Sequence, residues 1–401
     1  MGSDPEILFR GAEGIPTPDL WPEIQRRSAR GSRTSPVRRA ALIGLALAIA
    51  ATGIGLAVKA LSNGSAGPVI PGTSPSTRAT PVSVTATVVD RVRLEGLPGS
   101  VAAADGSVWV ATYDFDRGTG AVVHIDAATD QILATVPIDG FVSNLAAGDG
   151  AAWVPVGVNG KGSSLLRIDA VTNEVTGRVD GVTGPVVVAP VGVWAVEAGD
   201  GGRDAAVVEI DPSTLQIERR IPVGEVPLDM ATGSGSIWVL TRTVTGDVTS
   251  SGPLLRIDAG TGSVTPIDVN SAGVWIAADD AGVWLDVWDS SRSNNSVAQF
   301  IDASTGAPSG QPGAVYNFRP FAVAEDRVWF ISGPHDQGLP KGGVCGLNVV
   351  TRKIDACAAP GSIADLELAH DPAAFEPSTH SIWVGEYQKP WVTRIDIAQA
   401  L

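Results

Sequence analysis

One short phrase, an apolar strand centred on tryptophan, recurs seven times between residues 107 and 386. "GSIWVLT" at residues 235–241 is one copy, and successive copies are 44, 41, 44, 46, 45 and 54 residues apart. A period of about 45 residues is typical of one four-stranded blade of a β-propeller. The sequence therefore predicts seven such units, whose tryptophans are Trp109, Trp153, Trp194, Trp238, Trp284, Trp329 and Trp383.

A second phrase follows most tryptophan strands and has the pattern of a β-hairpin. In "VVEIDPSTLQIERRIPV", apolar residues alternate on both arms around a corner that begins with an acidic residue. Such a side chain accepts backbone N–H groups two residues further along the chain. Because they recur at one corner, we interpret these residues as turn formers rather than as metal ligands or bases: Asp126, Asp169, Asp211, Asp258, Asp302 and Asp396, with Asn348 in the sixth unit.

The two ends of the repeat region complement each other. The last unit stops at Leu401 without a fourth strand, and "SVTATVVDRVRLEG" at residues 83–96 matches the missing strand. Pairing of this N-terminal strand with the C-terminal strand closes the ring and removes its exposed edges. The predicted fold class is all-β: a seven-bladed β-propeller of four-stranded blades, preceded by a single transmembrane helix.

These phrases resemble the repeats of the YVTN-type β-propeller proteins, including the YncE-like group. The segments "VGEVPLDMATGSGSIWVLT" and "VVEIDPSTLQIERRIPVG" carry the resemblance most clearly, with Trp where the named motif has Tyr. The resemblance covers about four fifths of the chain and implies the propeller fold. It implies little about function, because propellers host many unrelated activities.

The first 82 residues differ from the repeats. Six arginines between residues 23 and 39 precede 19 uncharged residues, 40–58. As a helix, 19 residues rise about 28 Å, which is close to the thickness of a bilayer core, and the arginines favour a cytoplasmic N-terminus. We predict a cytoplasmic tail at 1–38, a transmembrane signal anchor at 39–61, a flexible Gly/Ser/Pro linker at 62–82 and an extracytoplasmic propeller at 83–401, anchored to the cell membrane. A cleaved signal peptide remains the alternative.

The two cysteines lie symmetrically around the centre of the sixth hairpin, "CGLNVVTRKIDAC". Cys345 and Cys357 would then face each other across antiparallel strands, at a separation that a disulfide can bridge. An even pair in an exported domain predicts a disulfide. No histidine or second cysteine pair stands at the spacing of metal ligands, so we expect no metal site and no cofactor.

Charge narrows the range of partners. Residues 83–401 carry 19 Lys and Arg against 38 Asp and Glu, a net charge of −19. Such a surface repels phosphate backbones, so nucleic acid is an unlikely partner. Protein, peptide and cell-wall glycan remain as candidate ligands.

The loops after the tryptophan strands vary in length and sequence, and variable loops on a rigid scaffold commonly carry function. If they share a face, they form one rim of charged groups. We therefore predict a membrane-anchored extracytoplasmic module for binding, sensing or protein interaction, with these ligand-rim residues: Asp114, Asp116, Arg242, Asp286, Arg319 and Glu386.

An enzyme is the alternative. In propellers similar to virginiamycin B lyase, a histidine and acidic groups perform an elimination, and His335 stands in a loop where it could serve such a lyase or hydrolase together with the rim carboxylates. No partner acid is fixed by its spacing from His335. We therefore favour a binding module without chemistry of its own, and His335 stays a weak catalytic candidate.

Overall fold

The structure, a computed structural model, describes residues 84–399 except for 115–118, 143, 159–161, 198, 200–203, 246–247, 270–271, 290–294, 310–317, 333–338, 340–342, 359–372 and 387–388. The regular elements of these residues are 29 β-strands. Within that part of the chain, no helix has the length and apolar character needed to cross a membrane. The predicted tail, anchor and linker (residues 1–82) lie outside the described residues.

The strands form seven sheets, each built from consecutive strands except where the chain ends meet. Blade 1 contains β2 (Leu97–Ala104), β3 (Ser107–Asp114), β4 (Thr119–Asp126) and β5 (Ile132–Ile138). Blade 2 contains β6 (Phe141–Val142), β7 (Ala146–Gly148), β8 (Ala151–Val158), β9 (Gly162–Asp169) and β10 (Val175–Asp180). Blade 3 contains β11 (Val182–Ala189), β12 (Gly192–Glu197), β13 (Ala206–Ile210) and β14 (Ile217–Pro222).

The remaining blades repeat this order. Blade 4 contains β15 (Val226–Gly233), β16 (Ser236–Thr245), β17 (Val248–Asp258) and β18 (Val264–Ile267). Blade 5 contains β19 (Ala272–Ala278), β20 (Gly282–Asp289), β21 (Asn295–Asp302) and β22 (Pro308–Ser309). Blade 6 contains β23 (Arg319–Ala324), β24 (Arg327–Ile331), β25 (Val344–Asn348) and β26 (Ile354–Ala358). Blade 7 contains β27 (Ala373–Glu376), β28 (Ser381–Gly385), β29 (Trp391–Gln399) and, from the other end of the chain, β1 (Val84–Arg93).

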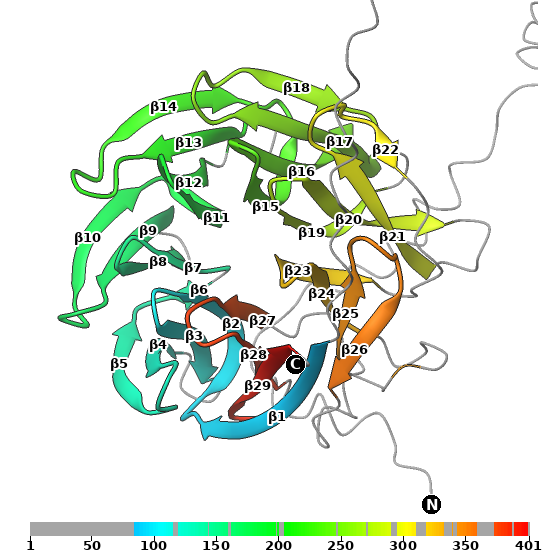
Figure 1. Ribbon diagram of the computed structural model, residues 1–401. Helices are drawn as coiled ribbons and strands as arrows, with labels where there is room; N and C mark the ends of the chain where they lie inside the picture. Colours follow the sequence, from blue (N-terminus) through cyan, green and yellow to red (C-terminus); the bar gives the residue numbers. More distant parts are fainter. Residues whose placement is uncertain are drawn as a thin grey trace, which may run out of the picture. The chain divides into compact units, whose positions relative to one another are not determined.

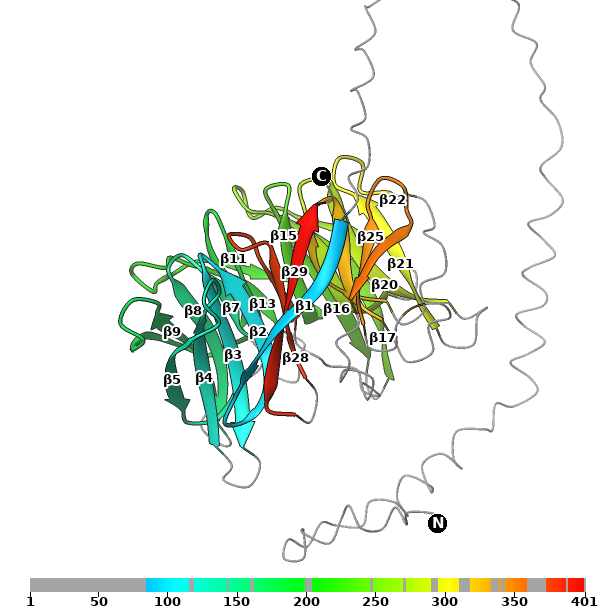
Figure 2. The same ribbon diagram turned by 60° about the horizontal axis from the view of Figure 1, so that its bottom comes forward.

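The sheets surround a common centre, with the first strand of each blade innermost (Figure 1). β1 runs antiparallel to β29, with Cα partners from Val84↔Gln399 to Arg93↔Trp391 (Figure 2). The N-terminal strand therefore supplies the fourth strand of the last blade, as the sequence predicts. The predicted seven-bladed propeller of four-stranded blades is confirmed.

The repeated tryptophans are the packing units of the blades. Each is at most 1% exposed. In three blades the indole N–H donates to a carbonyl five residues earlier: Trp153 to Gly148 (3.4 Å), Trp238 to Gly233 (3.3 Å) and Trp329 to Ala324 (3.2 Å). The same side chain thus fills the core and satisfies the turn that leads into its own strand.

In several blades, the side chain that covers the tryptophan also contacts the next blade. The Arg219 guanidinium lies 5.6 Å from the Trp194 ring and donates to the Ala259 carbonyl of blade 4 at 2.6 Å. In blade 1, His124 stacks on Trp109 at 3.9 Å, and its Nδ1 lies 2.6 Å from Asn173 Oδ1 of blade 2. These contacts tie separate sheets into one rigid ring.

The predicted turn chemistry is present in the hairpins. Asp211 Oδ1, for example, accepts the N–H groups of Ser213 (2.8 Å) and Thr214 (2.7 Å), and these bonds, together with the Ser213 hydroxyl, lower its pKa to about 2. The prediction was wrong for Asp396, which lies within β29 and accepts from Arg394 Nε at 2.7 Å. No hairpin follows at that point because β29 pairs directly with β1.

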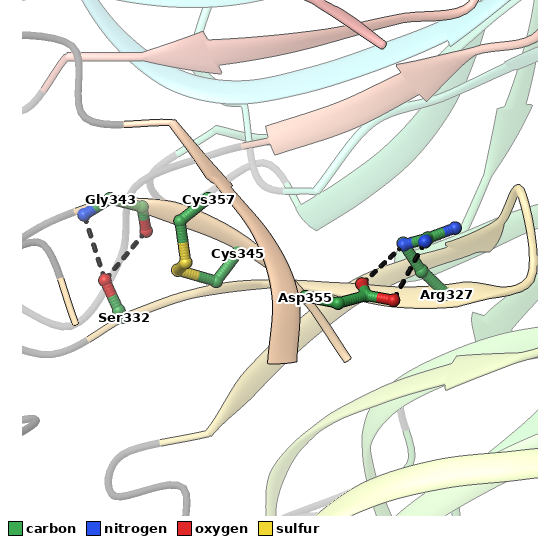
Figure 3. Close-up of a disulfide and its surroundings, with 6 residues drawn as sticks. All are labelled: Arg327, Ser332, Gly343, Cys345, Asp355 and Cys357. Carbon is green, nitrogen blue, oxygen red and sulfur yellow. Dashed lines mark hydrogen bonds and ion pairs between the residues drawn. A yellow bond between two sulfur atoms is a disulfide. The ribbon is translucent and has the colours of Figure 1, made fainter. Parts of the chain in front are cut away.

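The predicted disulfide joins Cys345 on β25 to Cys357 on β26, which are direct Cα partners 4.2 Å apart. Figure 3 shows the disulfide together with an ion pair of the same blade. In this pair Arg327 donates to both carboxylate oxygens of Asp355, at 2.7 and 2.9 Å. The sixth hairpin is therefore fixed by a covalent bond as well as by its backbone ladder.

Candidate functional site

The ends of the tryptophan strands and the starts of the inner strands lie on one face of the propeller. The second strand of a blade ends opposite the start of the first, as the pairs Leu97↔Tyr113 and Val226↔Arg242 show. The variable loops follow these strand ends in the sequence. We call this side the variable face.

The central channel opens on the variable face into a cavity of about 500 Å³. All seven blades contribute to its wall, through residues at the start or in the middle of their inner strands or just before them. Both polar and aromatic side chains line it, including Ser100, Phe141, Asn144, Pro185, Asp229, Trp275 and Phe321. We call this space the mouth cavity.

Five of these side chains occupy one repeat position, nine residues before the blade's tryptophan. The residues in blade order are Ser100, Asn144, Pro185, Asp229 and Trp275, and Pro320 stands at the same sequence position of blade 6. Six blades thus present five different side chains there. A varied surface at one repeat position is what a scaffold adapted to one ligand presents.

Two residues at this position also join neighbouring blades. Ser100 Oγ accepts the Leu145 N–H at 3.1 Å, and Asp229 Oδ2 accepts the Ile276 N–H at 3.2 Å. Asp229 Oδ1 accepts the N–H of Met230 at 2.9 Å. Asp229 therefore has a structural role in addition to any contact with a ligand.

A second carboxylate lies behind the wall of the mouth cavity. Asp286 is on β20, fully buried, and its Oδ1 accepts the N–H groups of Val274 and Trp275, both at 2.9 Å. Its Oδ2 is buried without a hydrogen-bond partner. A Cβ at Gly273 would lie 1.7 Å from Oδ2, so this glycine is required where the inner strand crosses the carboxylate.

Asp286 also departs from the repeat. It stands two residues after the tryptophan of its blade and points into the same interior. The other blades have apolar residues or glycine at this position: Ala111, Pro155, Val196, Leu240, Ile331 and Gly385. A buried carboxylate in place of an apolar residue holds the backbone that presents Trp275.

Burial raises the pKa of both carboxyl groups. The pKa of Asp286 rises to about 7, against the opposing effects of the Trp275 and Val274 N–H donors and of the Arg319 charge. Asp229 is half-buried in the wall of the mouth cavity, and desolvation also raises its pKa to about 7. The Asp286 charge adds to that increase, so ionisation of one group disfavours ionisation of the other.

A cation and an aromatic ring complete the group. The Arg319 guanidinium, at the start of β23, lies 5.3 Å from the centre of the Trp275 ring. Its charge lowers the pKa of Asp286. Of the six predicted rim residues, the structure thus brings Asp286 and Arg319 together.

The other described rim residues lie apart from this group. Asp114 ends β3 and faces Thr119, and Arg242 is exposed near the end of β16. Glu386 is 2% exposed, lies 3.1 Å from Arg91 Nε and accepts the Thr393 hydroxyl at 2.7 Å. It thereby links β1 to the last blade, so its observed contacts are those of ring closure.

Two candidates, Asp116 and His335, lie outside the described residues. Within the part of the chain that the structure describes, no three His, Cys, Asp or Glu side chains are placed to hold a metal ion. The elimination chemistry considered for His335 and the placement of Asp116 on the ligand rim therefore stay predictions.

Trp275 and Asp229 carry the mouth cavity but were not among the six predicted rim residues. The signal that identifies them is positional: both stand nine residues before a repeated tryptophan. Trp275 also lies outside the repeated phrase, so the packing role of the repeated tryptophans does not account for it.

The sequence matches no protein-family model, and no curated protein matches it significantly. Solved structures share its fold at low identity. The WD40 domain of Neurospora crassa Pan2 is 7% identical, with 79% of this chain and 96% of that one covered and a TM-score of 0.52. Kuenenia stuttgartiensis hydrazine synthase is 13% identical, with 77% of this chain and 97% of that one covered and a TM-score of 0.52. The Myceliophteria thermophila Cps50 (Swd1) propeller domain is 12% identical, with 78% of this chain and 99% of that one covered and a TM-score of 0.52. At these identities the likeness concerns architecture alone: the described chain is a seven-bladed β-propeller.

Proposed function

We propose that the protein is a binding module that holds its ligand in the mouth cavity of the variable face. One observation carries this proposal: all seven blades line the cavity, and one repeat position of its wall bears five different side chains in six blades. A purely structural channel would repeat its lining as the blades repeat their tryptophans. Pockets with mixed aromatic and polar walls are the usual form of ligand sites.

The module is proposed to be anchored in the cell membrane with the propeller on the extracytoplasmic side. The arginine-rich segment before residues 40–58 supports this orientation. The Cys345–Cys357 disulfide supports an oxidising compartment. The resemblance of the repeats to the YVTN-type and YncE-like propellers is consistent with an exported propeller.

The proposed ligand is a protein or peptide. The WD40 domain and the Cps50 propeller that share the fold show that this scaffold occurs as a discrete domain of larger systems. A net charge of −19 over residues 83–401 favours basic partners over phosphate-rich ones. Glycan is the other outcome that the experiment below distinguishes.

Site-specific crosslinking in the native host tests this function. A p-benzoylphenylalanine replaces Phe141, which is 59% exposed at the mouth cavity. The matched control places it at Val191, which is 53% exposed and lines a cavity at the opposite ends of the inner strands. We expect a discrete crosslinked species from position 141 and none from 191. Mass spectrometry of that species separates peptide from saccharide, and equal labelling at both positions would refute the proposal.

The orientation has its own test. Maleimide–polyethylene glycol added to intact cells before and after reduction reports whether Cys345 and Cys357 are oxidised. External protease reports whether the propeller is accessible in spheroplasts. We expect oxidised cysteines and a protease-sensitive propeller; reduced thiols inside a protected domain would contradict the orientation.

A further inference from the structure

The wall of the mouth cavity combines one enclosed carboxylate with several aromatic rings. Asp229 is the acidic side chain of the wall, and Trp275, Phe141 and Phe321 are its aromatic side chains. Phe141 is 59% exposed, and its ring meets that of Tyr113 edge-on with the centroids 5.9 Å apart. An exposed aromatic ring at the edge of a cavity is available to contact a ligand held there.

The charge of Asp229 is not balanced by a described cation. Its two oxygens accept the N–H groups of Met230 and Ile276, which stabilise the ionised form. Burial and the Asp286 charge act in the opposite direction and dominate. An ionised Asp229 is therefore held in a desolvated place where a ligand cation would be favoured.

Arg319 does not fill that role. Its guanidinium lies over the Trp275 ring, and its charge acts on Asp286. Among the charged groups on neighbouring elements, Asp286 comes from β20, Arg319 from β23 and the exposed Arg242 from β16. The adjacent inner strands β11 and β19 contain no ionisable side chain.

We propose that the mouth cavity binds an organic ammonium group, with Asp229 as its counter-ion and the aromatic rings of the wall around its methylene groups. The inference rests on the proposed function and names the chemistry of its ligand. Ammonium groups bind favourably to aromatic faces and to carboxylates, and the attraction grows when water is excluded. Anionic ligands are disfavoured by the same carboxylate.

A basic peptide and a free amine share this chemistry, so the experiment separates them. Calorimetric titrations of the full-length protein use the tripeptide acetyl-Gly-Lys-Gly-amide and n-butylammonium chloride. The control peptide carries Nε-acetyllysine, which keeps the chain length and removes the charge. We expect the lysine peptide to bind at least about tenfold more tightly than its acetylated form, since a buried ion pair is lost. Tighter binding of the peptide than of butylammonium identifies a protein source; the reverse identifies a small amine.

The matched variants are Asp229→Asn and Asp280→Asn. Both remove one carboxylate that accepts a backbone N–H between blades 4 and 5, because Asp280 Oδ1 accepts the Ser234 N–H at 2.9 Å. Asp280 lies at the opposite cavity. We expect Asp229→Asn to weaken lysine-peptide binding about tenfold or more and Asp280→Asn to leave it unchanged. The Asn carbonyl can keep the single N–H contact of Asp280 and one of the two N–H contacts of Asp229, and thermal unfolding of both variants checks that they remain folded.

Binding should also depend on pH. Ionised Asp229 is the binding form, and its pKa is about 7, while a lysine ammonium stays charged throughout. Affinity for the lysine peptide should rise about tenfold from pH 6 to pH 8, following the ionised fraction. The Asp229→Asn variant should lose most of this rise.

Equal affinity of the wild type and Asp229→Asn for the lysine peptide overturns the ammonium inference, and so does equal affinity of the wild type for the lysine and acetyllysine peptides. If the Phe141 crosslink persists in either case, the binding function at this mouth still stands. Loss of both the peptide signal and the crosslink removes the inference and the proposed function together.

Discussion

Replacement of Asp286 by asparagine should stabilise the protein at alkaline pH. Asp286 is fully buried, and one of its oxygens has no hydrogen-bond partner. An asparagine carbonyl can accept the Val274 and Trp275 N–H groups that the carboxylate now accepts. The variant thus keeps these contacts and removes the cost of a buried charge.

The pKa of Asp286 rises from 3.8 to about 7 in the folded protein. Between these values the unfolded chain releases a proton that the folded chain retains, so this group lowers stability as pH rises from about 4 to about 7. A shift of about three units corresponds to about 4 kcal/mol at pH 8. We therefore expect Asp286→Asn to be about 2 to 4 kcal/mol more stable than the wild type at pH 8 and nearly equal to it at pH 4.

Thermal unfolding of the full-length protein at pH 4, 6 and 8 measures this difference. For a domain of this size the gain corresponds to roughly 3 to 6 °C in Tm. The difference between the two proteins isolates Asp286 from the turn aspartates, whose lowered pKa values make them stabilising above pH 4. A variant that is less stable than the wild type by the same amount at every pH would refute the reasoning, because the carboxylate would then be needed in its ionised form.

Three further substitutions test the ring and its turns. Arg91→Ala should lower the free energy of unfolding by about 1 to 3 kcal/mol because it removes the cation beside the buried Glu386, and urea titration should show recovery in the Arg91→Ala/Glu386→Gln double variant. Cys345→Ala/Cys357→Ala should cost about 3 kcal/mol, and dithiothreitol should lower the wild-type urea midpoint to the same extent; an unchanged midpoint would contradict this. Asp211→Ala should lower Tm more than Asp211→Asn, since asparagine forms the same turn in the sixth blade; equal losses would count against the turn mechanism.

The repeats made the fold predictable. Seven tryptophan strands at a period of about 45 residues, most of them followed by a hairpin with an Asp or Asn corner, specify blade number and strand order from local pattern alone. The pairing of β1 with β29 and of Cys345 with Cys357 followed because both depend on register within one sheet. Both pairings join neighbouring strands of one sheet, so the repeat pattern is enough to predict them.

The mouth cavity was less predictable because it depends on contacts between blades. Asp286 follows Trp284 by two residues in a loop-like sequence, and its burial results from the passage of β19 over it at Gly273. Glu386 looks like a loop acid, but its charge meets Arg91, which is 295 residues distant in the chain. Neither contact leaves a pattern in a single repeat.

The carboxylate of Asp229 differs from those of the turn aspartates in its burial. The turn aspartates are exposed, and the N–H groups that they accept lower their pKa values. Asp229 accepts two such bonds, yet burial raises its pKa to about 7. Serine performs the same bridging role in blade 1 without a charge. The carboxylate at this position therefore costs free energy in the empty cavity, and a cation bound beside it would offset that cost.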